Sequence, residues 1–251
     1  MVSPHRVFDS RCFALDDFAS MAALVPGATL NDAIVAVCAG GLRSYLELNA
    51  QLPTADLSAQ LQGSLTAEPG GTSQPGLLLR LGTDTDDPVR RLAALHHQAT
   101  AAPAYAGLAG IRGAAPVAST FTPLLGPARP WFLAGARITY LSALLPISDG
   151  RGPAFATTVY DGRVVISLTS CRDLLPDPQV FTECIGASFQ QLLGLTESAR
   201  RSPAGRYQVR SQQPRVPSPG THNPARRSAR KAATSRAAGP AARPRSTTPR
   251  R

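Results

Sequence analysis

Two pairs of polar side chains stand where chemistry could occur. Asn31 and Asp32 lie in the first turn of a predicted helix, close to the positive end of the helix dipole. His96 and His97 form the second pair, and imidazole is the side chain most often used as a general base near neutral pH. Asn31 and Asp32 could support a site or serve only as polar residues at a helix start, and both interpretations are open.

The helix that carries the first pair is predicted over residues 28–49. Thr29 is its expected N-cap, and Asp32, three residues on, can return a hydrogen bond to the capping residue. Gly40 and Gly41 lie in its middle, where each costs about 1 kcal/mol relative to Ala, which predicts a close approach of another backbone. Apolar residues at helical spacing indicate burial on more than one side: Leu30, Ile34, Val37, Cys38, Leu42, Tyr45 and Leu46.

Strands and further helices alternate along the rest of the chain. Asp87-Pro88 and Asp177-Pro178 each predict a helix start, and the second helix is expected to run to about Leu195. Asp161-Gly162 predicts a tight hairpin between two strands. Asp16 is the expected cap of a short helix that ends at Pro26-Gly27, and extended structure is predicted over 6–14, 57–65, 77–81, 117–121, 131–138, 155–160 and 163–170. We therefore expect an α/β or α+β fold, a mixed sheet with packed helices.

Charge divides the chain into two parts. Residues 1–199 hold all 16 acidic residues and 12 of the 26 basic ones, a net charge of −4, whereas residues 200–251 hold the other 14 bases and no acid. We predict one folded lobe over residues 1–198 and a disordered Arg/Pro/Ala-rich basic tail over 199–251. Such a tail would bind nucleic acid or anionic lipid weakly and without specificity.

Several classes of protein are disfavoured by what the sequence lacks. The four cysteines, Cys12, Cys38, Cys171 and Cys184, form no C-x-x-C and lie among apolar neighbours, so we expect reduced, buried thiols and no metal site. The apolar run over 33–42 is too short to span a bilayer, and no signal peptide is visible. We expect a cytoplasmic protein that can associate with a membrane or lipid-droplet surface.

Four segments, in order, resemble the C-terminal half of the bacterial wax ester synthase/diacylglycerol acyltransferase family. They are N-D-x-x-x-A-V-C-A-G-x-L-R-x-Y-L from Asn31, T-D-T-D-D-P-V-R-R-L from Thr83, G-P-x-x-P-x-x-L-x-G-A-R-I from Gly126, and Y-D-G-R-V followed by C-R-D-x-x-P-D from Tyr160. The likeness covers roughly residues 6–195.

The resemblance implies a fold, a reaction and site residues. The fold would be one lobe of a chloramphenicol acetyltransferase-like, CoA-dependent acyltransferase, with two α/β halves around a channel. Acyl-CoA would be the co-substrate, a lipid alcohol the acceptor, and triacylglycerol or a wax ester the product, with no bound cofactor. By family match Asn31, Asp32, Gly126 and Pro127 would border the channel, and Asp161 and Gly162 would form the hairpin turn.

The catalytic base of that family is absent from this chain. Family members carry it as the second His of His-His-x-x-x-Asp-Gly in their N-terminal half. His96-His97 has no Asp-Gly after it and falls inside a predicted helix, so we interpret the pair as one packed and one solvated side chain. The family's Ser-Asn-Val-Pro-Gly-Pro also becomes Thr122-Pro123-Leu124-Leu125-Gly126-Pro127, which loses its Asn. We assign no catalytic residue to this chain, and whether it is an enzyme stays undecided.

Three hypotheses follow. The chain is an acyltransferase half with little or no activity alone, or it gains activity from a separate chain that brings the N-terminal half. The alternative, from another class, is a non-catalytic protein that binds nucleic acid or anionic lipid through its basic tail.

Overall fold

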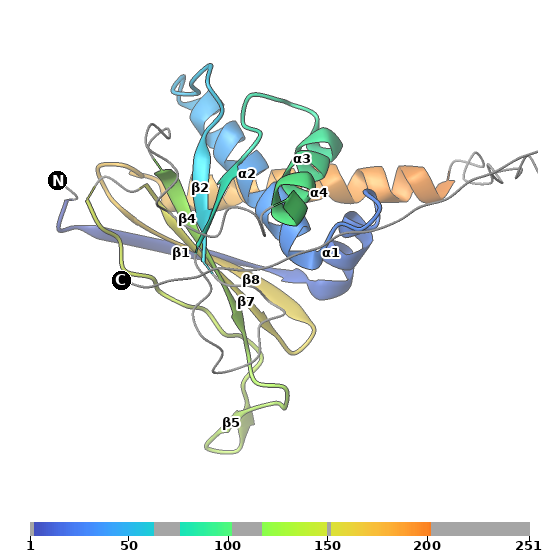
Figure 1. Ribbon diagram of the computed structural model, residues 1–251. Helices are drawn as coiled ribbons and strands as arrows, with labels where there is room; N and C mark the ends of the chain where they lie inside the picture. The colour runs from blue at the N-terminus through green and yellow to red at the C-terminus, as the bar shows by residue number, and fades with distance from the viewer. Residues whose placement is uncertain (1–2, 63–75, 102–116, 150–151, 202–251) are drawn as a thin grey trace, which may run out of the picture. The chain divides into compact units, whose positions relative to one another are not determined.

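The computed structural model describes residues 3–62, 76–101, 117–149 and 152–201 (Figure 1). The predicted tail over 199–251 therefore lies almost wholly outside the described residues. The Ala/Gly-rich stretch 103–115, whose composition predicts only a weak helix, also lies outside them. The helices are α1 (Leu15–Ala22), α2 (Leu30–Leu48), α3 (Pro88–Ala101) and α4 (Pro178–Arg201). Because α4 continues to Arg201, it passes both the expected helix end near Leu195 and the expected domain boundary.

A six-stranded mixed sheet has the order β1-β8-β7-β4-β2-β3. Its strands are β1 (Arg6–Ala14), β2 (Ser58–Leu61), β3 (Leu77–Arg80), β4 (Val117–Leu125), β7 (Ala154–Tyr160) and β8 (Arg163–Cys171). The strand pairs β2–β4 and β4–β7 are parallel and the others are antiparallel. A separate two-stranded sheet pairs β5 (Phe132–Leu133) with β6 (Ala136–Arg137). The expected mixed sheet with packed helices is confirmed.

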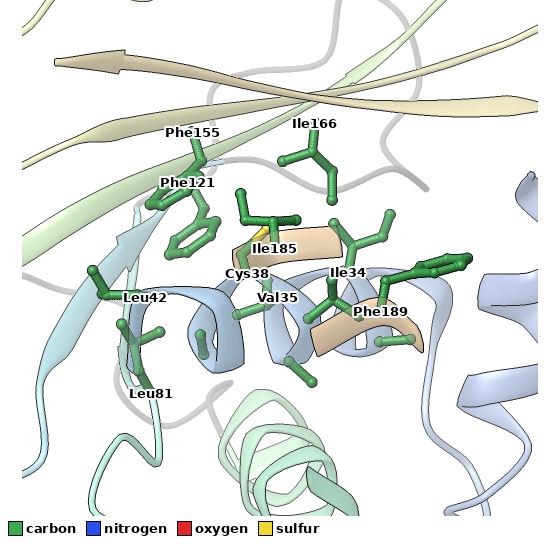
Figure 2. Packing of buried hydrophobic residues seen from close by; sticks show 14 of the residues in the cluster. Ile34, Val35, Cys38, Leu42, Leu81, Phe121, Phe155, Ile166, Ile185 and Phe189 are labelled. Atoms are coloured by element: carbon green, nitrogen blue, oxygen red, sulfur yellow. The ribbon is translucent and has the colours of Figure 1, made fainter. Parts of the chain in front are cut away.

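The core lies between one face of the sheet and the helices. Figure 2 shows Phe121, Phe155 and Ile166 of the sheet pointing toward α2 and α4. The rings of Phe121 and Phe155 are stacked with their centroids 4.6 Å apart. Helix α2 also contacts α1 and α3, and its side chains from Asp32 to Leu42 are all buried. The prediction of a helix buried on more than one side is therefore confirmed.

The two glycines of α2 allow α4 to approach closely. A Cβ added at Gly41 would lie 2.8 Å from the Cα of Ile185, and one at Gly40 would lie 2.2 Å from Ser188 Oγ. Real Cβ atoms essentially never make contacts this short, so at Gly41 even a methyl group would force the backbone of α4 to shift. The close backbone approach that the sequence predicted is confirmed.

At Arg80, the last residue of the edge strand β3, one side chain of α3 covers the edge of the sheet. The Gln98 amide donates from Nε2 to the Arg80 carbonyl at 3.0 Å, and its Oε1 accepts from the Arg80 N–H at 2.8 Å. Both outward backbone groups of Arg80 are therefore satisfied within the chain.

Several local predictions need correction. Asp16 lies in the first turn of α1 and does not cap it, because the N-cap residue is Ala14. The Leu15 N–H instead donates to the Gly162 carbonyl at 3.0 Å, so a loop distant in sequence replaces a side-chain cap. Strand β2 is buried at all four residues, although apolar and polar residues alternate over 57–65, a pattern that predicts a half-buried strand.

Two more expectations were wrong in detail. Residues 131–138 are not one extended segment, because Ala134 and Gly135, with φ of 48° and 84°, turn the chain into the β5–β6 hairpin. Of the four free cysteines, Cys38 and Cys171 are buried as expected, but Cys12 and Cys184 are half-buried.

Candidate functional site

The first candidate cluster is built at the start of α2. Thr29 Oγ1 accepts from the Asp32 N–H at 3.2 Å, and Asp32 Oδ2 accepts from the Thr29 N–H at 2.9 Å. This reciprocal pair is the capping box that the sequence predicted. Asp32 is only 5% exposed, so its carboxylate is held in one position.

His96 of α3 reaches the same carboxylate. Its Nδ1 lies 3.0 Å from Asp32 Oδ2, and the half-buried ring ties α3 to the start of α2. Gly27, with a φ of 84°, lies beside the ring, where an added Cβ would be 3.2 Å from Nε2. The expected arrangement of one packed and one solvated histidine agrees with the half-buried His96 and exposed His97, but the bond to Asp32 was not predicted. No local signal could have revealed it, since 64 residues separate the two partners.

Asn31 stands beside this cluster with its amide uncommitted. The side chain is half-buried, and it makes no hydrogen bond to the part of the chain that the structure describes. An amide has two donors and an acceptor oxygen, so it can bind a polar group of a ligand. Asp32 is occupied by Thr29 and His96, so within this pair Asn31 is the residue available for recognition.

The T-D-T-D-D-P segment is a structural loop held by a buried arginine. Arg91 is 2% exposed, and it donates through Nε to the Gly82 carbonyl at 3.1 Å and through its NH2 group to the Thr85 carbonyl. Burial, with a further contribution from the nearby Arg43 charge, lowers the pKa of Arg91. Asp87 Oδ1 accepts from the backbone N–H of Val89 at 2.9 Å, which confirms the predicted cap.

No metal centre is found in the described segments. They contain no group of three His, Cys, Asp or Glu side chains arranged to hold an ion. Nor is any helix in them long and apolar enough to cross a bilayer. Burial raises the pKa of the Cys38 and Cys184 thiols, which keeps both protonated and disfavours them as nucleophiles.

The second candidate cluster lies where the parallel strands β4 and β7 end, at their shared carboxyl edge. Two of the resembling segments meet there. Gly126 N donates to the Val159 carbonyl at 2.8 Å, and a Cβ at Gly126 would lie 2.8 Å from the Cβ of Tyr160. Asp161 and Gly162, with φ of 50° and 72°, form the predicted turn between β7 and β8. The glycine at 126 is therefore required by the close approach of the two strands.

A shallow hollow opens beside this turn. It has a volume of about 420 Å³ and is lined by Cys12, Phe13, Ala14, Asp161, Gly162 and Arg163. The size falls within the range of ligand pockets. Its lining offers the Cys12 thiol, the Arg163 guanidinium and the Asp161 carboxylate, which is paired with Arg137, and it contains no histidine.

The predicted site residues thus fall into two clusters. Asn31 and Asp32 belong to the first, whereas Gly126, Pro127, Asp161 and Gly162 belong to the second. No hydrogen bond or ion pair between described residues joins the two clusters directly. That these residues border a substrate channel remains a prediction, since such a channel would need walls from elsewhere.

Comparison with known proteins agrees with the resemblance. Residues 99–193 match the family model of the WS/DGAT C-terminal domain. The chain is similar to the O-acyltransferase WSD of Acinetobacter baylyi, with 29% identity over 203 residues, covering 71% of this chain and 44% of that protein.

Solved structures show the same fold. The wax ester synthase/diacylglycerol acyltransferase from Marinobacter aquaeolei VT8 superposes with a TM-score of 0.64 and 24% identity, over 78% of this chain and 50% of that one. The epimerization domain of tyrocidine synthetase B follows with a TM-score of 0.52 and 11% identity, over 79% and 49%. The chain spans about half the length of these proteins. The family model and the curated relative agree that this chain is similar to the WS/DGAT C-terminal domain, and the solved structures share its fold.

Proposed function

We propose that this chain is the C-terminal half of an O-acyltransferase that moves an acyl group from acyl-CoA to a lipid alcohol. The products would be triacylglycerol or a wax ester. The observation that supports this most is the match of residues 99–193 to the WS/DGAT C-terminal domain, because these residues form β4, β7, β8 and most of α4. The tail-based binding alternative is not favoured by these comparisons.

The reaction needs a base, and the described residues do not contain the His-His-x-x-x-Asp-Gly motif that carries it in the family. A histidine must take the proton of the alcohol, whose oxygen then attacks the thioester carbonyl, and CoA leaves as the thiol. His96 is the half-buried imidazole of the first cluster, and its Nδ1 is engaged by the carboxylate that caps α2. We therefore assign the base to the His-His-x-x-x-Asp-Gly half, and we assign His96 to holding α2.

Asn31 is the residue we assign to the substrate. Its neighbours fix the helix start through the Thr29–Asp32 box and the His96–Asp32 bond, so the amide is presented from a rigid position. Rigid placement of a polar group lowers the cost of orienting the reactants. The acceptor is a lipid, so we place the protein at a membrane or lipid-droplet surface when it acts.

The proposal is tested by reconstitution. The full chain is incubated with a long-chain acyl-CoA and either diacylglycerol or hexadecanol, alone and after co-expression with the N-terminal half of the Acinetobacter relative. We expect neutral-lipid product only from the pair. Turnover by the isolated chain would refute the claim that it is inactive without the other half. A complex that forms but shows no turnover would refute the proposed function.

Substitution of Asn31 sharpens the test. Asn31→Ala should lower kcat/KM of the pair about tenfold, the effect of one lost hydrogen bond of about 1.4 kcal/mol. Ser44→Ala, an exposed position on the same helix, is the matched control and should leave kcat/KM unchanged. Equal activities of the two variants would remove Asn31 from the site.

A further inference from the structure

Large apolar side chains stand exposed on the hairpin that leaves the end of β4. Trp131, Phe132 and Leu133 are consecutive and are 54%, 63% and 72% exposed. Figure 1 shows this hairpin extending from the sheet on the side away from the helices. A contiguous exposed apolar patch marks an interaction site, and Trp is among the residues that contribute most to binding energy.

The base of the hairpin is held rigidly by one buried tyrosine. Tyr160 OH accepts from the Trp131 N–H at 2.8 Å and donates to the Ile138 carbonyl at 2.9 Å. The Ile138 N–H closes the stem by donating to the Trp131 carbonyl at 2.8 Å, and Arg137 forms an ion pair with Asp161. Tyr160 itself is 4% exposed. A surface fixed in advance loses little conformational entropy on binding, so this hairpin is suited to docking.

We propose that this hairpin arm, residues 126–138, is the docking surface for the other half of a WS/DGAT-type acyltransferase. The inference rests on the proposed function and names the surface through which the halves meet. Strands β5 and β6 form a sheet of only two residues each, which is marginal on its own. Both outer edges can accept a strand from a partner protein, while the apolar side chains enter its pockets.

The size of the relatives identifies the partner. This chain matches 44% of the Acinetobacter protein and 50% of the Marinobacter chain, so half or more of each relative lies outside the match. A lipid surface is the competing partner, and it needs several free bases, since each Lys or Arg contributes about 1 kcal/mol. On the arm, Arg137 is paired with Asp161, and Arg129 is its other base. The charge pattern therefore favours a protein.

Capture from co-expressing cells tests the inference. The tagged full chain is co-expressed with the N-terminal half of the Acinetobacter relative, and the amount that co-purifies is measured. Substitution of Trp131 and Phe132 together by Ser should reduce capture at least about tenfold. Substitution of Leu48 and Leu174 by Ser is the control, because these side chains are 68% and 53% exposed elsewhere on the molecule. The control should capture as much as the unchanged chain.

Unchanged capture by the Trp131/Phe132 variant, or no capture by the unchanged chain, overturns the docking surface. Trp131 is the only tryptophan of the chain, so its fluorescence reports the arm directly. Phosphatidylglycerol/phosphatidylcholine vesicles should leave its emission maximum unchanged, and a blue shift on vesicles would assign the arm to lipid instead. If capture depends on the arm but the captured pair shows no acyl transfer, the proposed function is refuted and the docking surface stands.

Discussion

The contact between α2 and α4 at Gly41 gives a sharp test of the fold. In Gly41→Ala, the new methyl group would lie 2.8 Å from Ile185 Cα and 2.9 Å from Ile185 N. These are backbone atoms and cannot rotate away, and carbon atoms pack best at about 3.5–4.0 Å. The two helices would therefore have to separate by roughly 0.7 Å along their whole contact, which opens gaps in the core between them.

The expected loss of stability is the balance of two effects. Overpacking of this kind costs up to about 3 kcal/mol, whereas Ala in place of Gly favours the helix by about 1 kcal/mol. The free energy of unfolding should fall by about 2 kcal/mol. For a body of this size that lowers Tm by about 4–8 °C.

Urea titration followed by far-UV circular dichroism measures the change. Gly194→Ala is the matched control, because an added Cβ there meets nothing within 4 Å, and it should stabilise α4 by about 1 kcal/mol. Gly40→Ala meets only side-chain atoms, chiefly Ser188 Oγ, so its cost should shrink when Ser188→Gly is added. A Gly41→Ala variant as stable as the Gly194→Ala variant would refute the close helix contact.

Three further outcomes are expected. Arg91→Met leaves the carbonyls that Arg91 binds unpaired and should lower the urea midpoint by the equivalent of about 2–3 kcal/mol; an unchanged midpoint would contradict the clamp. His96→Ala should cost about 1 kcal/mol in thermal melts by removing the bond to Asp32, and His97→Ala, at an exposed position, should cost nothing. Burial raises the pKa of the Cys38 thiol, so the folded chain retains a proton that an unfolded thiol loses near pH 8.5. The free energy of unfolding should fall as pH rises above about 8.5, and Cys38→Ala should flatten that slope in urea titrations.

Features set by neighbouring residues were predictable. The Thr29–Asp32 capping box spans three residues, and the Asp161-Gly162 turn needs only its own two residues in the left-handed region. The Asp87 cap acts on Val89 and Arg90, which directly follow Pro88. In each case the physical cause lies within a few residues, so sequence spacing is sufficient to predict it.

Features set by tertiary contacts were not predictable. An aspartate near a helix start, such as Asp16, is expected to cap α1. Instead the Gly162 carbonyl, which the sheet brings near, accepts the hydrogen bond of the Leu15 N–H. A charged residue such as Arg91 is expected at the surface. It is buried here because Gly40 and Gly82 leave room for its side chain. The role of Tyr160 in holding the hairpin arm likewise requires knowing that residues 131 and 138 lie beside the end of β7.

The single glutamine that covers β3 has a consequence for self-association. A sheet edge with free N–H and C=O groups is a template on which a second copy can add its own strand. At Arg80 the Gln98 amide supplies both missing hydrogen bonds, so another chain finds no partner there without displacing it. The same α3 that holds the start of α2 therefore also blocks the addition of a foreign strand at Arg80.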